Sequence, residues 1–112
     1  MEQFIPFRNQ KEVCRIPVSE VLYITQQRRK LKIVTHEREY VQYEKIREVI
    51  PYLDDRFYAC LKYTYINMDK IRGFANQSIH FTNGEGLAVG RDNFNRTKKE
   101  FLERIMKGKR NV

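Results

Sequence analysis

The sequence predicts a mainly β domain with one short helix and one C-terminal helix. Several short segments alternate apolar and polar residues, which is typical of half-buried strands. The dipeptide Asn83-Gly84 lies between two such segments, as expected for the tight turn of a hairpin. After Asp92 the apolar residues recur with the longer period of a helix.

The N-terminal half predicts strands joined by exposed turns. Residues 11–16 alternate and predict a first strand, and the β-rich residues 21–25 predict a second. Residues 26–29 contain no apolar side chain and therefore predict a turn. The alternating segment 30–36 leads into a return strand at 37–43, with the hairpin turning near the first two residues of that strand. One short helix follows, and its apolar face is formed by Tyr43, Ile46, Val49 and Ile50, with Pro51 ending it.

The C-terminal half predicts further strands and the last helix. Residues 57–67 predict strands followed by a turn at 67–70, and residues 78–90 predict a hairpin. The final helix begins near Asp92 or Asn93, because either side chain can cap a helix. Its apolar stripe consists of Phe94, Phe101, Leu102 and Ile105.

Length and composition indicate one globular domain. A chain of 112 residues suits a single domain, which we place at residues 1–107. The basic segment 108–112 has too few apolar residues to pack and is expected to fray. The N-terminus lacks the pattern of a signal peptide, and no segment is long and apolar enough to span a membrane. We therefore expect a cytoplasmic protein with no membrane insertion, in which Cys14 and Cys60 are reduced strand residues.

The charge balance favours a polyanionic partner such as nucleic acid. The chain has 22 basic and 14 acidic residues, which gives a net charge of +8. Basic residues concentrate in residues 26–32 and 91–112, whereas residues 37–48 mix both signs and predict an ordinary solvated surface. Basic residues without a specific partner are the alternative explanation.

The sequence predicts no enzymatic activity, no metal site and no bound cofactor. Cys14 and Cys60 do not have the spacing of a metal or redox motif. The only histidines, His36 and His80, lie beside a charged turn and in an alternating segment. The adjacent carboxylates at 54–55 follow the predicted short helix and are typical of a solvated turn.

The seven tyrosines have two interpretations. Exposed tyrosines can stack on single-stranded bases. Tyr23, Tyr40, Tyr58 and Tyr65 lie in predicted strands, however, where aromatic residues favour a half-buried surface. A structural role is therefore the favoured interpretation for these four.

Three loop cations are the best candidates for contacts with DNA bases. Arg29 lies in a polar turn, Lys62 interrupts the alternation of residues 57–67, and Arg91 follows the last predicted strand. An arginine at a loop tip suits DNA because its planar guanidinium can bind O6 and N7 of guanine together. The alternative is that each loop cation is simply solvated.

Three stretches of the sequence resemble the LytTR-type DNA-binding domain. They are "VSEVLYITQQRRKLKIVT" at 18–35, "LDDRFYACLKYTYINMDKIRGF" at 53–74 and "GLAVGRDNFNRTKKEFL" at 86–102. In that family the middle stretch has the form F-x-R-x-H-x-S-x-x-V-N-x-x-x-I, and a strand ending in Ser-Arg precedes the last helix. The matching residues are Phe57, Ile66, Asn67, Ile71, Val89 and Arg91. The departures are Leu61 for histidine, Lys62-Tyr63 for a polar pair and Gly90 for serine.

The resemblance implies an elongated stack of small, mostly antiparallel sheets whose loops enter successive major grooves of duplex DNA. Arg29, Lys62 and Arg91 match the base-contacting loops of the family, and these are the same three residues that loop position and charge select. Nearby basic residues are expected to attract phosphates without regard to sequence. These residues are Arg28, Lys30, Lys98 and Lys99.

The resemblance also implies a function and a set of partners. The expected function is sequence-specific binding of double-stranded DNA by a bacterial transcriptional regulator. Family members commonly bind paired direct repeats, so we expect two copies side by side on DNA. Control is expected from a regulatory protein partner or from a receiver domain. An RNA or single-strand binder and a protein-interaction module with a basic face are the alternatives.

Overall fold

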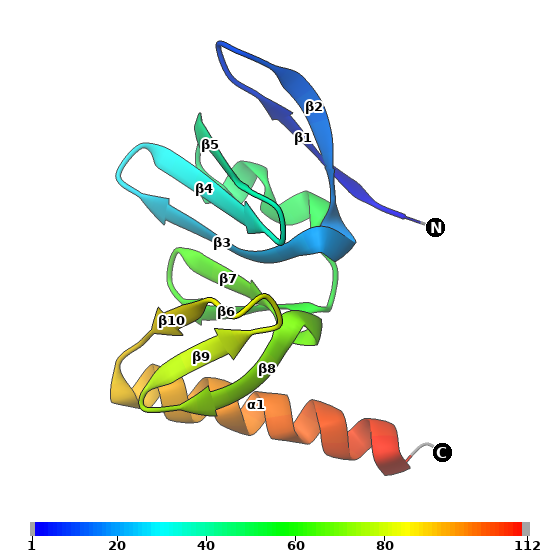
Figure 1. The fold of residues 1–112 in the computed structure, drawn as a ribbon, viewed down its shortest axis with the longest axis vertical. Helices are drawn as coiled ribbons and strands as arrows, with labels where there is room; N and C mark the ends of the chain where they lie inside the picture. The colour runs from blue at the N-terminus through cyan, green and yellow to red at the C-terminus, as the bar shows by residue number, and fades with distance from the viewer. Residues whose placement is uncertain (1, 111–112) are drawn as a thin grey trace. The chain divides into compact units, whose positions relative to one another are not determined.

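The computed structural model describes residues 2–110, and it describes side chains as far as residue 108. The chain folds into two compact units, Met1–Lys70 and Ile71–Val112. The mainly β fold class with small antiparallel sheets and a C-terminal helix is confirmed (Figure 1). The first unit contains β1 (Phe4–Arg8), β2 (Val13–Pro17), β3 (Val21–Gln27), β4 (Lys30–Thr35), β5 (Glu39–Tyr43), β6 (Phe57–Leu61) and β7 (Thr64–Asn67). It also contains four short 3₁₀ turns: η1 (Val18–Glu20), η2 (Ile46–Glu48), η3 (Ile50–Tyr52) and η4 (Met68–Lys70).

The strands of the first unit form two antiparallel sheets within the described residues. β1 and β2 pair with each other, and a five-stranded sheet has the order β5-β4-β3-β7-β6. The pairing of β3 with β7 joins the β3–β4 and β6–β7 hairpins into one sheet, with Thr25 opposite Thr64. Each predicted hairpin of this half of the chain is therefore present, and the sequence missed β1.

The core of the first unit lies between the β1–β2 pair, the five-stranded sheet and the 3₁₀ turns. It contains Ile5, Phe7, Ile16, Val18, Val21, Ile24, Leu31, Ile33, Ile46, Val49 and Phe57. Phe7 also packs edge-on against Tyr40, with ring centroids 5.1 Å apart. Burial of these side chains is the main favourable contribution to the stability of the unit, because each contributes about 1.5–3 kcal/mol relative to an exposed position.

An ion pair lies just before β6. The guanidinium of Arg56 donates to both carboxylate oxygens of Asp54, with an Nη2–Oδ2 distance of 2.7 Å and side chains 28% exposed. The hydrogen bonds from Arg56 hold the pKa of the Asp54 carboxyl below its usual value. The main chain of Arg56 also accepts a hydrogen bond from the amide of Met68 at 2.8 Å. The pair therefore stabilises the start of the β6–β7 hairpin. At the predicted solvated turn 54–55, the Asp54 carboxylate is partly buried and paired with Arg56.

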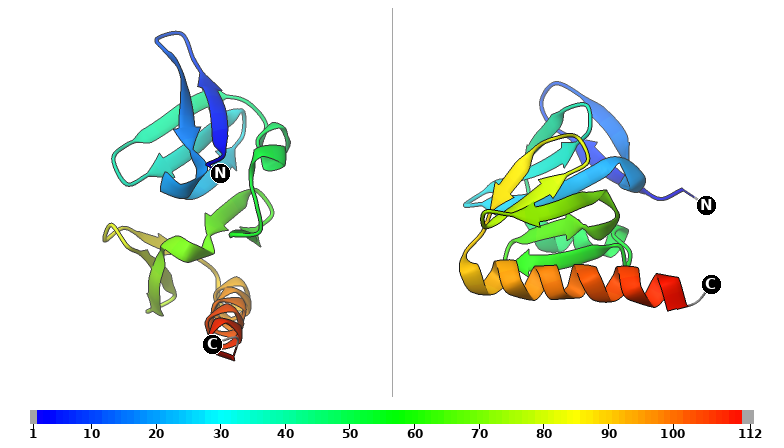
Figure 2. Two further views of the ribbon diagram at one scale, coloured as in Figure 1. Left: turned by 90° about the vertical axis from the view of Figure 1, so that its right-hand side faces the viewer. Right: turned by 60° about the horizontal axis from the view of Figure 1, so that its bottom comes forward.

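The second unit is a three-stranded antiparallel sheet with one long helix. Its elements are β8 (Ile71–Ala75), β9 (Ser78–Phe81), β10 (Gly86–Ala88) and α1 (Arg91–Arg110), and the strand order is β10-β9-β8. α1 runs along this sheet, as the two views of Figure 2 show. The ring of Phe74 in β8 lies 5.6 Å from that of Phe94 and 5.2 Å from that of Phe101, both in α1. These aromatic contacts attach the helix to its sheet.

Two hairpin turns of the second unit differ in their backbone. Asn76 and Gln77 have φ values of 53° and 57° and connect β8 to β9, a pattern that suits a type I′ turn. Between β9 and β10, Gly84 has φ 94°, and its amide donates to the carbonyl of Phe81. The predicted hairpin at 78–90 is thus confirmed. Its loop is longer than a two-residue turn, because Asn83 does not enter the left-handed region.

The predicted helix at 43–49 is replaced by two 3₁₀ turns, η2 and η3. Tyr43 ends β5 and is 76% exposed, so it does not belong to the apolar face. Ile46 and Val49 are buried as predicted. Pro51 lies inside η3 instead of ending a helix, since proline is tolerated in a first turn, where its missing N–H needs no partner.

Two expectations for the last helix were wrong. The helix starts at Arg91, and the amide of Phe94 donates to the carbonyl of Gly90, so neither Asp92 nor Asn93 is the cap. Leu102 and Ile105 are 49% and 54% exposed, so only the N-terminal part of the predicted stripe packs. Residues 108–110 belong to the helix, and residues 111–112 of the expected frayed tail lie outside the described residues. Of the described helices, none is long and apolar enough to cross a membrane.

We expect Asp54→Asn to lower the free energy of unfolding by about 1 kcal/mol at neutral pH, because the charge-assisted bonds to Arg56 are lost. The pKa of Asp54 is lower in the folded state than in the unfolded state. The stabilisation is therefore present above the unfolded pKa of about 3.9 and is lost as the pH falls through the folded pKa. Urea denaturation of both proteins across this pH range measures the difference.

Glu37→Gln is the matched control, since Glu37 is exposed in the β4–β5 turn. It should change the free energy of unfolding by less than about 0.5 kcal/mol, both at neutral pH and at acidic pH where Asp54 is protonated. An equal effect of both substitutions would contradict the role of the Asp54–Arg56 pair.

Candidate nucleic-acid interface

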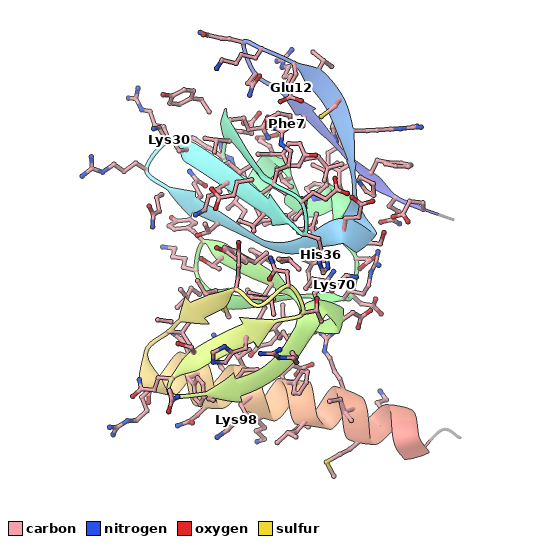
Figure 3. All side chains as sticks on the ribbon, in the orientation of Figure 1. Phe7, Glu12, Lys30, His36, Lys70 and Lys98 are labelled. Atoms are coloured by element: carbon pink, nitrogen blue, oxygen red, sulfur yellow. The ribbon has the colours of Figure 1, made fainter. Side chains whose placement is uncertain are left out.

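The β3–β4 turn presents consecutive cations. Gln27 pairs with Lys30 at the end of the hairpin, which leaves Arg28 and Arg29 as its two turn residues. Arg28 has φ 58°, a left-handed value that a two-residue hairpin turn requires at its first position. Arg28, Arg29 and Lys30 are all exposed. Figure 3 labels Lys30 at this turn, from which side chains with nitrogen tips extend outward.

The β6–β7 turn presents a lysine beside a tyrosine. Leu61 pairs with Thr64, so Lys62 and Tyr63 form the turn, and the pairing shifts between Ala59 and Leu61. Lys62, which the sequence placed at a break in the alternation, therefore lies in the turn itself. The ammonium of Lys62 lies 5.4 Å from the ring centroid of Tyr63, and both side chains are exposed.

The two turns lie at the same end of the five-stranded sheet (Figure 1). The hydroxyl groups of Thr25 and Thr64 are 2.8 Å apart across the β3–β7 pair. One residue further along β3, the amide of Gln26 donates to the carbonyl of Tyr63 at 2.9 Å. Arg29 and Lys62 are therefore held on adjacent hairpin tips. We call this region the turn end of the sheet.

The side chain of Gln26 connects the turn end to η2. Its Nε2 donates to the carbonyl of Arg28 at 2.8 Å, and its Oε1 accepts from the amide of Ile46 at 2.8 Å. The main-chain amide of Gln26 also donates to the Tyr63 carbonyl, so Gln26 links the β3–β4 turn, the β6–β7 turn and η2. No sequence pattern singled out Gln26, because its partners are remote in sequence or are main-chain groups.

Arg91 belongs to the second unit, where it is the first residue of α1. The preceding Gly90 and Val89 lead out of the three-stranded sheet, and the amide of Val89 donates to the carbonyl of Gln77 at 3.1 Å. Arg91, Lys98 and Lys99 are exposed on the helix. The ammonium of Lys98 lies 5.3 Å from the ring centroid of Phe94, and Figure 3 labels this lysine on α1.

The seven predicted DNA-contacting residues are exposed and do not pair with carboxylates within the part of the chain whose side chains are described. Other basic residues are in ion pairs, such as Arg38 with Glu12 and Arg104 with Glu100, each at 2.8 Å. Cations without a carboxylate partner remain able to bind an anionic ligand. The seven residues are Arg28, Arg29, Lys30, Lys62, Arg91, Lys98 and Lys99.

The tyrosines divide between the two interpretations. Tyr23 is buried, and Tyr40, Tyr58 and Tyr65 are partly buried, which agrees with the structural role. Tyr43 and Tyr63 are exposed near the turn end, and the sequence did not select them. The sequence feature that could have indicated their exposure is position, because each tyrosine lies at the end of an alternating segment, where a side chain has few neighbours.

Both cysteines lie in strands of the first unit. Cys14 is half-buried in β2, and Cys60 is buried in β6. Burial raises the pKa of the Cys14 thiol, which disfavours the reactive thiolate. Among the described residues, no group of three or more His, Cys, Asp or Glu side chains is arranged to hold a metal ion.

Exposed cations gathered on hairpin turns supply the positive charge that a nucleic-acid-binding domain requires. The family model of the LytTr DNA-binding domain matches residues 11–102, and the chain therefore belongs to this family of DNA-binding domains. Its fold is similar to the solved structure of a LytTr DNA-binding domain from Bacillus cereus, with a TM-score of 0.70 and 16% sequence identity. The similarity covers 91% of this chain and 98% of the other. Comparison with curated protein sequences finds no match.

We expect Gln26→Ala to lower the free energy of unfolding by about 1–2 kcal/mol, because two hydrogen bonds are lost and the partly buried amide of Ile46 loses its acceptor. Amide hydrogen exchange at Ile46 should accelerate in the variant. Gln27→Ala is the control, since Gln27 is exposed at the next position of β3. Equal exchange at Ile46 in all three proteins would contradict the linking role of Gln26.

Proposed function

We propose that this chain is the DNA-binding domain of a bacterial transcriptional regulator that recognises a specific duplex sequence through its turns. The observation that carries the proposal is the common location of the two cationic hairpin tips at one end of one sheet. Side chains on adjacent tips can contact one stretch of DNA together. Membership of a DNA-binding family supports the same conclusion.

Each group of cations has a separate role in the proposal. Arg29 and Arg91 contact base edges in the major groove, where a guanidinium can bind guanine in bidentate fashion. Lys62 contacts a base or a phosphate, because an ammonium is a point donor without the planar fork. The remaining cations supply attraction to phosphates that is independent of sequence. They are Arg28, Lys30, Lys98 and Lys99.

The proposed regulator binds paired, imperfect direct repeats, with two copies of the domain side by side on the DNA. Its activity is controlled by a protein partner or by a receiver domain in the same regulator. Selection of binding sites from a random pool of duplexes tests the first statement directly. A single unrepeated site among the selected sequences would contradict it.

A single-strand or RNA binder is the second candidate, and the exposure of Tyr43 and Tyr63 favours it. Competition between a duplex and a single strand of the same sequence separates the two functions. Preference for the duplex supports the proposal, and preference for the single strand supports the alternative. Absence of duplex binding at low salt would instead indicate a protein-interaction module.

We expect Arg29→Ala and Arg91→Ala each to weaken binding to the selected duplex by about 1–3 kcal/mol, because a bidentate base contact is lost. The loss should be larger on the selected duplex than on a scrambled one. Fluorescence anisotropy with both duplexes measures this difference. Equal losses on both would reject the base contact.

Lys98→Ala is the matched control for a phosphate contact. It should weaken binding to both duplexes alike and lower the magnitude of the salt slope by about 0.9. A sequence-dependent loss for Lys98→Ala would contradict its assignment to phosphate.

We expect Arg28→Gly to separate stability from binding. Glycine adopts φ 58° without the cost of about 1 kcal/mol that an L side chain incurs there, so the free energy of unfolding should rise. Affinity for every duplex should fall, because a cation is lost from the turn end. Gln77→Gly, at φ 57° in the second unit, is the control and should not lower affinity. Unchanged affinity of Arg28→Gly would remove Arg28 from the interface.

A further inference from the structure

We propose that Lys45 and Arg47, on either side of Ile46 at η2, bind a backbone phosphate of the duplex as a third cationic element of the turn end. The inference rests on the proposed function and extends its interface. Residues 37–48 carry mixed charges, and the sequence predicted an ordinary solvated surface there. The charged residues at the end of this segment are exposed, and the fold places residues 45–47 next to both hairpin turns.

The geometry that supports this site is a hollow of about 410 Å³ at the turn end. It is lined by Gln26, Arg28, Lys45, Ile46, Arg47 and Tyr63. Its walls therefore combine three cations, an amide and a phenol, and none of these residues is a carboxylate. The three cations can attract an oxyanion, and the phenol can donate a hydrogen bond to it.

The carboxylates of this region lie on another side of the same cations. A neighbouring hollow of about 420 Å³ shares Arg28, Lys45 and Arg47 but is also lined by Glu44 and Glu48. The phosphate is therefore expected on the side of Tyr63, where the lining has no negative charge.

Arg47 is available despite its neighbour Glu48. Its Nε lies 3.7 Å from the Glu48 carboxylate, and the two side chains are 72% and 57% exposed. An exposed pair of this kind contributes little to stability, so the guanidinium can exchange this partner for a phosphate. The amide of Lys45 donates to the Glu44 carboxylate at 3.0 Å, but its exposed ammonium pairs with no carboxylate among the described residues.

The backbone that carries these cations is anchored. The side chain of Ile46 is 4% exposed and packs in the core of the first unit, and its amide donates to Gln26. Lys45 and Arg47 therefore extend from fixed Cα positions beside the β3–β4 turn. Less entropy is lost on binding than for cations on a mobile segment.

The test uses the double variant Lys45→Ala/Arg47→Ala and measures binding to the selected and scrambled duplexes at several salt concentrations. We expect a loss of roughly tenfold on both duplexes and a decrease of about 0.9 in the magnitude of the salt slope, as for one lost phosphate contact. Thermal unfolding checks the fold, which should be retained because both side chains are exposed. Lys11→Ala is the control, since it removes an exposed lysine between β1 and β2 and should leave the slope nearly unchanged.

Glu48→Gln supplies a test of opposite sign. Removing this carboxylate frees Arg47 and lowers the local negative charge, so affinity for both duplexes should rise. An unchanged or lower affinity would count against a phosphate bound by Arg47.

Several outcomes would overturn the inference. If the double variant binds both duplexes like the original protein while Arg29→Ala still loses selectivity, the inference fails and the proposed function stands. If neither duplex binds the original protein, both fail. A soluble anion is the other source of phosphate, and NMR titration with inorganic phosphate distinguishes it. Phosphate-induced shifts at Lys45 and Arg47, together with unchanged DNA binding by the double variant, would assign the hollow to a soluble anion.

Discussion

The antiparallel pairing of β3 with β7 determines where the candidate interface forms. It places Thr25 opposite Thr64, so the hairpin that ends in Arg28-Arg29 and the hairpin that ends in Lys62-Tyr63 finish together. A one-residue slip of β3 would move Ile24 out of the core cluster, because neighbouring side chains of a strand point to opposite faces. Burial of Ile24 in this cluster therefore favours the observed register, and the register fixes the relative position of the turns.

Hydrogen bonds between polar groups further stabilise the arrangement of the two hairpin turns. The bond between the Thr25 and Thr64 hydroxyl groups and the bond from the Gln26 amide to Tyr63 hold the last residues of both hairpins together. The Gln26 side chain then attaches the segment at Ile46 to the same end. Each bond contributes about 1 kcal/mol, which is small beside core burial, but these bonds determine which cations are neighbours.

The sequence predicted the parts of the fold whose cause is local. The alternating segment 30–36 contains β4, in which Leu31 and Ile33 are buried, and the segments on both sides of Asn83-Gly84 form a hairpin. β1 was missed because Pro6 interrupts a short segment, and proline is tolerated there only because β1 pairs with a single strand. The β8–β9 turn was missed because Gln77 takes a left-handed conformation that usually indicates glycine.

The candidate site was predictable only in part. Arg29, Lys62 and Arg91 could be selected because loop position and charge are visible in the sequence, and all three are exposed. The spacing of Ile46 and Val49 suits either an α-helix or 3₁₀ turns, so it did not reveal how η2 is oriented. The link from Gln26 to Ile46 spans 20 residues and has no local signature, which is why the contribution of this segment emerged only from the fold.

Arg28 is a charged residue at a turn position whose left-handed backbone conformation is more favourable for glycine. A non-glycine residue at φ 58° is uncommon, and its cost of about 1 kcal/mol must be offset by the surrounding structure. Here the paired strands on both sides and the bond from Gln26 Nε2 to the Arg28 carbonyl hold the residue in place. Glycine would relieve the strain but would remove a cation from the hollow beside η2. Strain retained at an exposed turn together with an unpaired positive charge supports a binding role for this position.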